Sequence, residues 1–133
     1  MTLVDTNVLL DLVTDDLRWA SWSIAQLEAV SLRGPLLIND VVYAELSVRY
    51  AAIEELDAFV AAAGLEIAAI AREALFLAGK AYLRYHGAGG TRSGVLPDFF
   101  IGAQAAVAGW PLLTRDVGRT TAYFPSVRLI APA

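Results

Sequence analysis

The residue types that are absent or rare in this chain limit the chemistry that it can perform. Its 133 residues contain no cysteine, which excludes thiolate zinc sites, disulfides and cysteine nucleophiles and agrees with a reducing compartment. There is one histidine, His86, near the expected end of a helix, and we interpret it as structural. There is one lysine, Lys80, within a predicted helix. The sequence therefore offers no thiol chemistry and little that depends on imidazole or amine groups.

Long hydrophobic runs are also missing. Apolar residues make up 57% of the chain and its mean hydropathy is +0.54, yet no uninterrupted apolar stretch reaches the roughly 18 residues of a membrane helix. The first five residues lack the basic region and cleavage site of a signal peptide. We expect one domain, residues 1–133, in the cytoplasm, whose surplus hydrophobicity covers an oligomer or partner surface.

Charge does not decide the class of partner. Ten basic residues against fourteen acidic ones give a net charge of −4, whereas a nucleic-acid-binding protein usually carries a basic footprint. Four of the acids are candidate metal ligands, and setting them aside leaves ten charges of each sign. A nucleic-acid partner therefore stays open.

Short apolar segments alternate with helical patterns along the whole chain. This alternation predicts a parallel sheet covered by helices on both faces, with the site beyond the carboxyl ends of the strands. Strands are expected at residues 2–4, 36–38, 65–69, 112–113 and 127–130, and helices at 6–13, 19–33, 40–50, 53–63, 72–86 and 98–108. The helix from residue 98 is apolar nearly all round, and its small residues Gly102, Ala103 and Ala106 predict the close approach of another element.

Four carboxylates lie where apolar runs end or helices begin. Asp5 and Asp116 follow predicted strands, Asp98 opens the apolar helix, and Glu45 shares a helix face with valines. Such acids at one edge of a sheet repel each other unless a cation lies between them, and hard divalent ions prefer oxygen ligands. The sequence therefore predicts a Mg²⁺ or Mn²⁺ site.

Each acid also has an ordinary interpretation. Asp5 fits a helix cap or Asx-turn, Glu45 a snorkelling or salt-bridged side chain, Asp98 a helix-dipole partner and Asp116 a turn. The other ten acids are expected to be caps and solvated helix faces: Asp11, Asp15, Asp16, Glu28, Asp40, Glu54, Glu55, Asp57, Glu66 and Glu73. Trp19 and Trp22, one helical turn apart, favour core or interface packing over base stacking.

The ordered set of motifs resembles the PIN-domain nucleases, and within them the VapC-type toxins of toxin–antitoxin pairs. The segments that carry the resemblance are Val-Asp-Thr-Asn at 4–7, Val-Tyr-Ala-Glu-Leu at 42–46, Leu-Pro-Asp-Phe-Phe-Ile-Gly-Ala at 96–103, and Leu-Thr-Arg-Asp at 113–116 followed by Arg119, with Tyr-Phe-Pro at 123–125 and Leu-Ile at 129–130. It covers the whole chain and implies a three-layer α/β/α sandwich with a short central parallel sheet.

The resemblance also implies function. It suggests an endoribonuclease with one or two Mg²⁺ or Mn²⁺ ions, held by Asp5, Glu45 and Asp98, with Asp116 completing the acidic pocket. The supporting residues would be Thr6, Asn7 and Thr114, through hydrogen bonds, and Arg115, on a phosphate. The single histidine agrees, since metal-free ribonuclease chemistry usually needs two groups that titrate near pH 7.

Gln104 is a departure, because many related chains have histidine there. The family further implies a homodimer and an antitoxin that lays an amphipathic segment into an apolar groove and directs a basic side chain toward the acidic pocket.

Rival interpretations have weaker support. A phospho-accepting domain needs a lysine after a late strand, and a haloacid-type phosphatase needs Asp-x-Asp where this chain has Asp-Thr-Asn. A PIN fold used only for RNA binding or as a scaffold remains the alternative. The glycine-rich segment 87–94 lacks a P-loop ending, and we expect it to be a mobile rim of the substrate channel.

Overall fold

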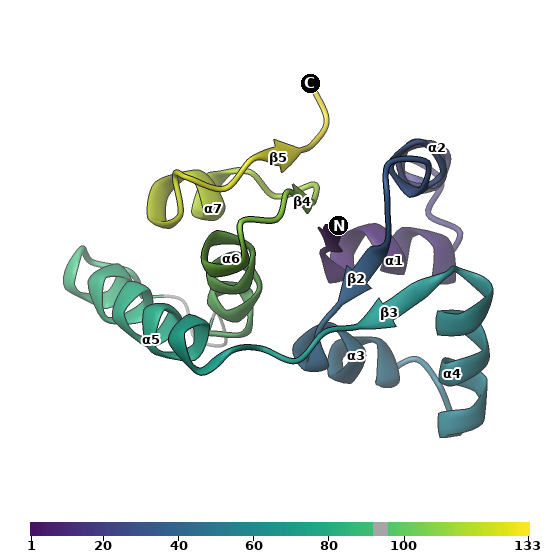
Figure 1. The fold of residues 1–133 in the computed structure, drawn as a ribbon, viewed down its shortest axis with the longest axis horizontal. Helices are drawn as coiled ribbons and strands as arrows, with labels where there is room; N and C mark the ends of the chain where they lie inside the picture. Colours follow the sequence, from purple (N-terminus) through teal and green to yellow (C-terminus); the bar gives the residue numbers. More distant parts are fainter. Residues whose placement is uncertain (92–95) are drawn as a thin grey trace.

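The computed structural model describes residues 1–91 and 96–133. Within them, five short strands form one parallel sheet in the order β3-β2-β1-β4-β5 (Figure 1). The strands are β1 (Thr2–Val4), β2 (Leu36–Ile38), β3 (Leu65–Ile67), β4 (Leu112–Leu113) and β5 (Leu129–Ile130). The predicted parallel sheet is confirmed.

The first strand lies at the centre of the sheet. Leu3 pairs with Leu37 of β2 on one side and with Leu112 of β4 on the other, and all of β1 and β2 is buried. At one edge, β3 exposes Glu66 and Ile67. A strand buried on both faces requires the continuous apolar runs seen here, and residues that follow β1 and β4 come together at the same edge.

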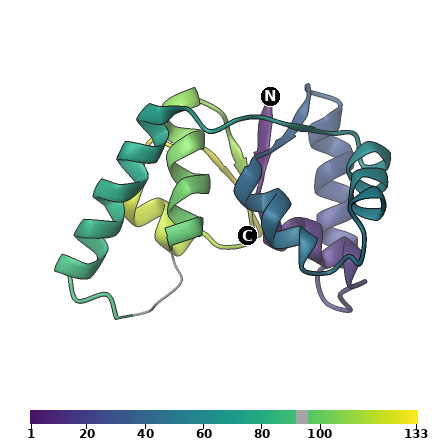
Figure 2. The ribbon, with the colours of Figure 1, turned by 90° about the horizontal axis from the view of Figure 1, so that it is seen from below.

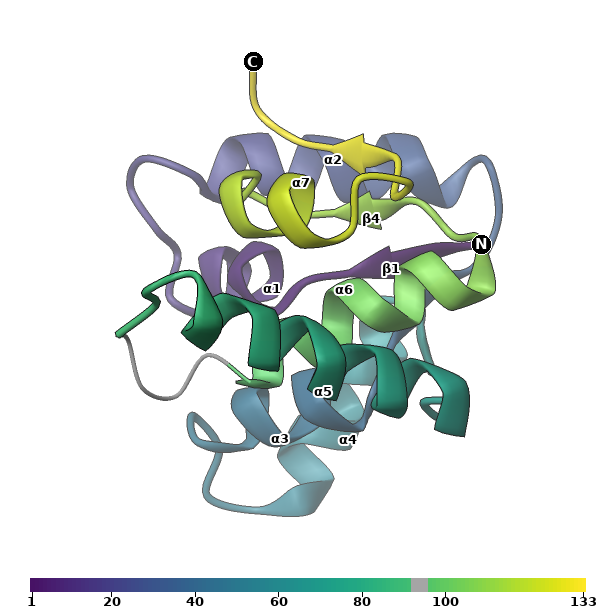
Figure 3. The same ribbon diagram turned by 90° about the vertical axis from the view of Figure 1, so that its left-hand side faces the viewer.

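The helices cover both faces of the sheet. They are α1 (Thr6–Val13), α2 (Ala20–Ser31), α3 (Asp40–Ser47), α4 (Ile53–Ala62), α5 (Arg72–Gly87), α6 (Leu96–Ala108) and α7 (Gly118–Tyr123). Helices α5 and α6 lie to one side of the strands, and α1, α2 and α4 to the other (Figure 2). Figure 3 shows α5 and α6 packed along each other in front of β1. This is the predicted three-layer α/β/α arrangement.

Two apolar clusters hold the layers together. The larger cluster contains the strands with α1 to α4 and part of α6. The smaller one joins α5 and α6 through Ala78, Phe99 and Ala103, with Phe124 beyond α7. A Cβ atom at Gly102 would lie only 2.5 Å from the ring of Phe124, so the predicted close approach to this helix is confirmed.

Several element ends differ from the sequence-based expectation. Helix α3 ends at Ser47, three residues earlier than predicted, and β3 and β5 are shorter than expected. Helix α7 was not predicted at all. Its six residues include a glycine and two threonines, which have low helix propensity, so packing rather than local preference accounts for it.

Part of the glycine-rich segment 87–94 lies outside the described residues, which omit 92–95. Among the helices that are described, none is long and apolar enough to cross a membrane.

Candidate functional site

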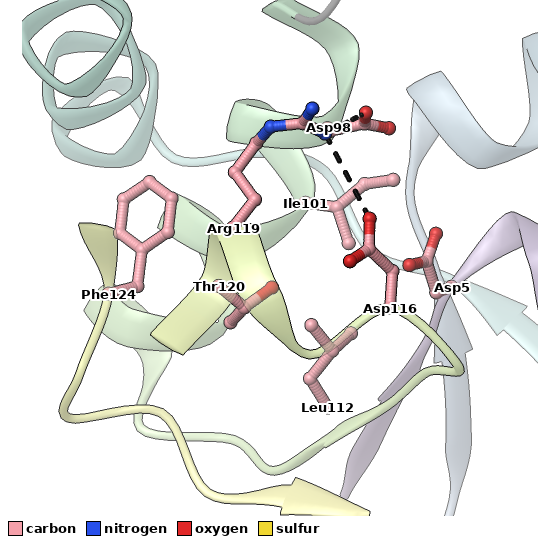
Figure 4. A pocket seen from close by; sticks show the side chains of 8 residues that line it. All are labelled: Asp5, Asp98, Ile101, Leu112, Asp116, Arg119, Thr120 and Phe124. Carbon is pink, nitrogen blue, oxygen red and sulfur yellow. Dashed lines mark hydrogen bonds and ion pairs between the residues drawn. The ribbon is translucent and has the colours of Figure 1, made fainter. Parts of the chain in front are cut away.

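The predicted acids gather at the carboxyl edge of the sheet. Asp5 follows β1, Asp116 follows β4, and Asp98 lies in the first turn of α6. These three side chains line one small pocket of about 20 Å³, room for roughly one water molecule (Figure 4). Its remaining lining residues are Ile101, Leu112, Arg119, Thr120 and Phe124.

Asp5 contacts several other residues of this site. Its Oδ2 accepts a 2.7 Å hydrogen bond from the Thr114 hydroxyl, and its Oδ1 accepts one of 2.7 Å from the backbone N–H of Thr6. Burial, with smaller contributions from the charges of Asp98 and Glu45, raises the pKa of Asp5 to about 6, although the two hydrogen bonds lower it. The site therefore holds a carboxylate in an environment that disfavours negative charge.

Glu45 joins the group from α3. Its Oε1 accepts a 2.7 Å hydrogen bond from the Thr6 hydroxyl. Burial raises its pKa, the Thr6 hydrogen bond lowers it, and the charge of Asp98 raises it. The face that Glu45 shares with Val48 is not a core face, because Val48 is 84% exposed while Val42 and Leu46 are buried. Glu45 is thus a half-buried residue within electrostatic reach of Asp5 and Asp98.

Thr114 and Asn7 link the ends of β1 and β4. Thr114 is fully buried, and its oxygen accepts a 3.0 Å hydrogen bond from the backbone N–H of Asp116 while its hydroxyl donates to Asp5. The Asn7 side chain lies 3.4 Å from both Asp5 Oδ2 and the Thr114 oxygen. Thr6, Asn7 and Thr114 therefore contact the acids that the sequence analysis assigned them to support.

Arg119 neutralises part of the acidic pocket. It reaches over from α7, with its Nη1 2.7 Å from Asp98 Oδ2 and 4.0 Å from Asp116 Oδ2 (Figure 4). The rings of Tyr85 and Phe99 lie 5.9 and 5.8 Å from the guanidinium carbon. Asp98 is also more exposed than expected for the end of a buried helix, with 45% of its side chain accessible.

Arg115 forms an ion pair with Asp11. The resemblance implied a phosphate contact for Arg115, which stays a prediction, and we wrongly expected Asp11 to lie on a solvated helix face. Instead, Asp11 is 2% exposed and accepts two hydrogen bonds from Arg115, at 2.8 and 2.9 Å. Asp11 lies on the inner side of α1, where a buried carboxylate needs a charged partner, and Arg115 provides it.

Comparisons with known proteins agree with this geometry. The PIN domain family model matches residues 2–120, most of the chain. The chain belongs to the PIN domain family. PIN domains are generally nucleases that use divalent metal ions. No curated protein sequence matches it significantly.

Solved structures show the same fold. A chain of the VapBC2 complex from Rickettsia felis, bound to a DNA fragment from their promoter, matches this PIN domain with a TM-score of 0.75 and 18% identity, over 99% of this chain and 98% of that one. DNA-bound VapBC from Salmonella typhimurium gives 0.70 and 17%, over 98% and 96%. A toxin–antitoxin complex from Klebsiella pneumoniae gives 0.65 and 23%, over 96% and 95%.

The donor set of this PIN domain suits a hard divalent cation. All the candidate ligands are carboxylates, and the raised pKa of Asp5 reflects burial and repulsion that a bound cation would relieve. Across residues 1–91 and 96–133, no three acidic or histidine side chains converge closely enough to hold one ion between them. Arg119 pairs with Asp98 in this arrangement and supplies part of the positive charge that the cluster needs.

Gln104 does not contact the acids of this PIN domain. Its Oε1 accepts a 2.8 Å hydrogen bond from Asn39, and its Nε2 donates to the carbonyls of Ala68 and Ala69. Asn39 in turn caps α3 by accepting from the backbone N–H of Val42. Gln104 therefore links α6 to the segment after β3 and, through Asn39, to α3, the helix that carries Glu45.

The contacts of two residues around the site were not anticipated from the sequence. Arg119 was noted in the motif but given no role, although its spacing of three from Asp116 is that of neighbours on a helix surface. Asp11 follows Asn7 by four residues, which places both on one face of α1. The four-residue spacing between Asn7 and Asp11 was the signal in the sequence that could have identified Asp11.

Proposed function

We propose that this PIN domain, residues 1–133, is a Mg²⁺- or Mn²⁺-dependent endoribonuclease. The observation that supports the proposal is that Asp5, Asp98 and Asp116 all line one pocket, with Glu45 in electrostatic reach of Asp5. A divalent ion bound there would lower the pKa of a bound water and stabilise charge on the scissile phosphodiester.

The chain's own residues would organise that chemistry. Asp5, Glu45 and Asp98 would bind the ion, and Asp116 would complete the pocket. Thr114 and Thr6 orient two of these carboxylates by hydrogen bonds of 2.7 Å each. Orientation of ligands by such partners matters because a carboxylate free to rotate loses binding free energy on ordering.

RNA cleavage by the purified protein tests the proposal. Structured RNA would be incubated with Mg²⁺, with Mn²⁺ and with EDTA, beside Asp98→Asn prepared identically. Asp40→Asn is a matched control, because Asp40 is also an exposed acid in the first turn of a helix, α3. We expect metal-dependent cleavage by the wild type and Asp40→Asn only.

The alternative is a PIN fold that binds RNA or serves as a scaffold without cleaving it. Cleavage that is equal in Asp98→Asn and wild type would point to contamination and contradict the metal-site assignment. RNA binding without cleavage of any RNA tested, in either metal, would favour the binding module.

We further propose that the protein is the toxin of a toxin–antitoxin pair. The support is the similarity of its fold to chains of VapBC and other toxin–antitoxin complexes. An antitoxin segment would occupy an apolar hollow of about 230 Å³, lined by Leu12, Ile24, Leu27, Glu28, Ser31, Leu36 and Ala63. Co-expression with the product of an adjacent gene, followed by co-purification, tests this pairing.

A cytoplasmic location and a homodimer complete the proposal. Exposed apolar side chains on α5, namely Leu75, Phe76 and Leu83, offer a surface that a second copy could cover. Sedimentation equilibrium of the purified protein tests the dimer directly, and a monomer at all concentrations would contradict it.

A further inference from the structure

Asp11 is a buried acid outside the acidic pocket that accepts three hydrogen bonds from two side chains. Its Oδ2 accepts hydrogen bonds from the Ser23 hydroxyl at 2.7 Å and from Arg115 Nε at 2.8 Å, and its Oδ1 accepts from Arg115 Nη2 at 2.9 Å. Only 3% of the Asp11 side chain is exposed. The forked, two-bond geometry fixes the guanidinium in position and orientation, which one point charge would not do.

Residue 115 is attached to α1 at two points. Its side chain binds Asp11, and its backbone N–H donates a 3.2 Å hydrogen bond to Asn7 Oδ1. Asn7 and Asp11 are four residues apart and lie on the same face of α1. The segment that leaves β4 is therefore fastened along one helix face rather than being a free loop.

The two residues on either side of Arg115 in the chain are both linked to the acidic pocket. Thr114 donates the 2.7 Å hydrogen bond to Asp5, and Asp116 lines the pocket and has its backbone N–H bonded to Thr114. A displacement of residue 115 would therefore move an orienting hydroxyl and a candidate ligand together.

Trp19 contacts the arginine of this ion pair. The guanidinium carbon of Arg115 lies 5.0 Å from the centre of the Trp19 ring, which meets Trp22 edge-on at 6.0 Å. Trp22 packs against the larger apolar cluster. The Trp19 ring thus adds a cation–π contact to Arg115, whose side chain is 26% exposed, while Asp11 is 3% exposed.

We propose that the Asp11–Arg115 ion pair is a positioning device that holds Thr114 and Asp116 in register with Asp5, so that divalent-ion binding depends on it. The effect on divalent-ion binding rests on the proposed metal-dependent function. The positioning of Thr114 and Asp116 does not depend on that function. Arg115 acts through its neighbours and is a positioning residue, not a phosphate ligand.

The competing role, a direct contact between Arg115 and an RNA phosphate, makes the opposite prediction for Asp11→Asn. That substitution would release the guanidinium and leave RNA binding intact or stronger. As a positioning device, the pair fails when either partner is changed, and Asp11→Asn and Arg115→Lys have the same effect. Lysine keeps the charge of Arg115 but loses its planar fork.

The experiment measures Mn²⁺ affinity by calorimetry without RNA, together with the ¹⁵N amide shifts of Thr114 and Asp116 without metal. Wild type, Asp11→Asn and Arg115→Lys are compared with Arg18→Lys. Arg18 is the matched control because its guanidinium carbon also lies 5.0 Å from the Trp19 ring, while Arg18 itself is exposed. RNA binding in the absence of divalent ions is measured in parallel.

We expect Asp11→Asn and Arg115→Lys each to weaken Mn²⁺ binding by about 10- to 100-fold, the usual effect of losing a partner that orients a metal ligand. The double variant should bind no more weakly than the weaker single variant, because the two residues act as a unit. Both amides should shift in each variant, and Arg18→Lys should match the wild type in both measurements.

Three results would decide against the proposal. Wild-type Mn²⁺ affinity with unshifted amides in both variants would overturn it, as would loss of RNA binding in Arg115→Lys with RNA and Mn²⁺ binding both intact in Asp11→Asn. An equal loss in Arg18→Lys would show a general effect of the Trp19 surface instead.

Failure of the proposed function has a different signature. A wild type that binds no Mn²⁺ would overturn the metal-dependent function, and the amide shifts alone would then decide the positioning. If circular dichroism shows that Asp11→Asn does not fold, Arg115→Lys and Ser23→Ala are compared with the wild type instead. Ser23→Ala is suitable because it removes only one hydrogen bond to Asp11.

Discussion

The carboxylate of Asp5 makes the stability of this fold depend on pH. Its pKa is about 6 in the folded protein, against 3.8 for an unperturbed aspartate, so the folded state binds the proton more tightly than the unfolded state does. The resulting contribution to stability is fully present below about pH 4 and is lost as the pH rises to about 6. A shift of this size corresponds to about 3 kcal/mol.

Asp5→Asn should therefore stabilise the metal-free protein at neutral pH. We expect a gain in the free energy of unfolding of up to about 3 kcal/mol above pH 6 that disappears below about pH 4. Denaturant unfolding in EDTA across this range measures it. Glu66→Gln, an exposed acid on β3, should show no such pH dependence. A constant difference between Asp5→Asn and wild type at all pH values would contradict the assignment.

Arg119 would compete with a divalent ion for the acids that it contacts, Asp98 and Asp116. Its removal in Arg119→Gln should lower the stability of the metal-free protein, because Asp98 and Asp116 lose their cation, and should strengthen Mg²⁺ binding several-fold. Melting temperatures in EDTA and in millimolar Mg²⁺ separate the two effects. Arg128→Gln, an exposed arginine before β5, is the control. Weaker Mg²⁺ binding in Arg119→Gln would show that Arg119 supports the ion site.

The residue scale is also where sequence-based prediction failed most clearly. The three acids that line the pocket, Asp5, Asp98 and Asp116, could be singled out because each follows a strand or begins a helix. Asp11 could not, since an acid within an amphipathic helix looks the same whether it faces solvent or a partner 104 residues away in the chain. A bidentate pair such as Asp11–Arg115 has no local signature, so it needs the fold to be known.

Among the secondary-structure elements, helix α6 depends on close packing. Its Gly102 lies against the ring of Phe124, a residue that also lines the acidic pocket. The small residues of this helix predicted the close approach, although its partner could not be identified, because α7 and the chain beyond it have weak local preferences.

Gly102→Ala should destabilise the protein despite the higher helix propensity of alanine. The added Cβ would lie 2.5 Å from a ring atom that is itself buried, and overpacking of this kind costs roughly 1–3 kcal/mol. Gly79→Ala is the matched control in α5, where nothing lies within 4 Å, and should stabilise by up to about 1 kcal/mol. Equal effects in urea unfolding of the two variants would contradict the packing argument.

For the whole molecule, ligand binding and folding stability are linked. An ion that binds only the folded protein raises its melting temperature, and it must displace protons from its ligands. We therefore expect Mn²⁺ to raise the melting temperature at pH 7 and to do so less below about pH 6, the pKa of Asp5. Asp98→Asn should lose this response. A pH-independent increase that persists in Asp98→Asn would indicate binding elsewhere.

The architecture of the whole molecule was the most predictable part. Alternating apolar strands and helices predicted a parallel sheet between helical layers, and the motif order predicted its family. Strand order was not predicted, because residues 2–4 carry no mark that distinguishes a central strand from an edge strand. The central place of β1 follows from its pairing with both β2 and β4.

That central place has a consequence for synthesis on the ribosome. The first strand is made long before its second neighbour, β4, which begins at Leu112, and the hydrogen bond from Thr114 to Asp5 joins residues 109 apart. A nascent chain can assemble β1, β2 and β3 first, whereas Thr114 and Asp116 can reach Asp5 only after β4 has been made. The acidic pocket therefore forms later than the first three strands, and an incomplete chain that ends before β4 lacks it.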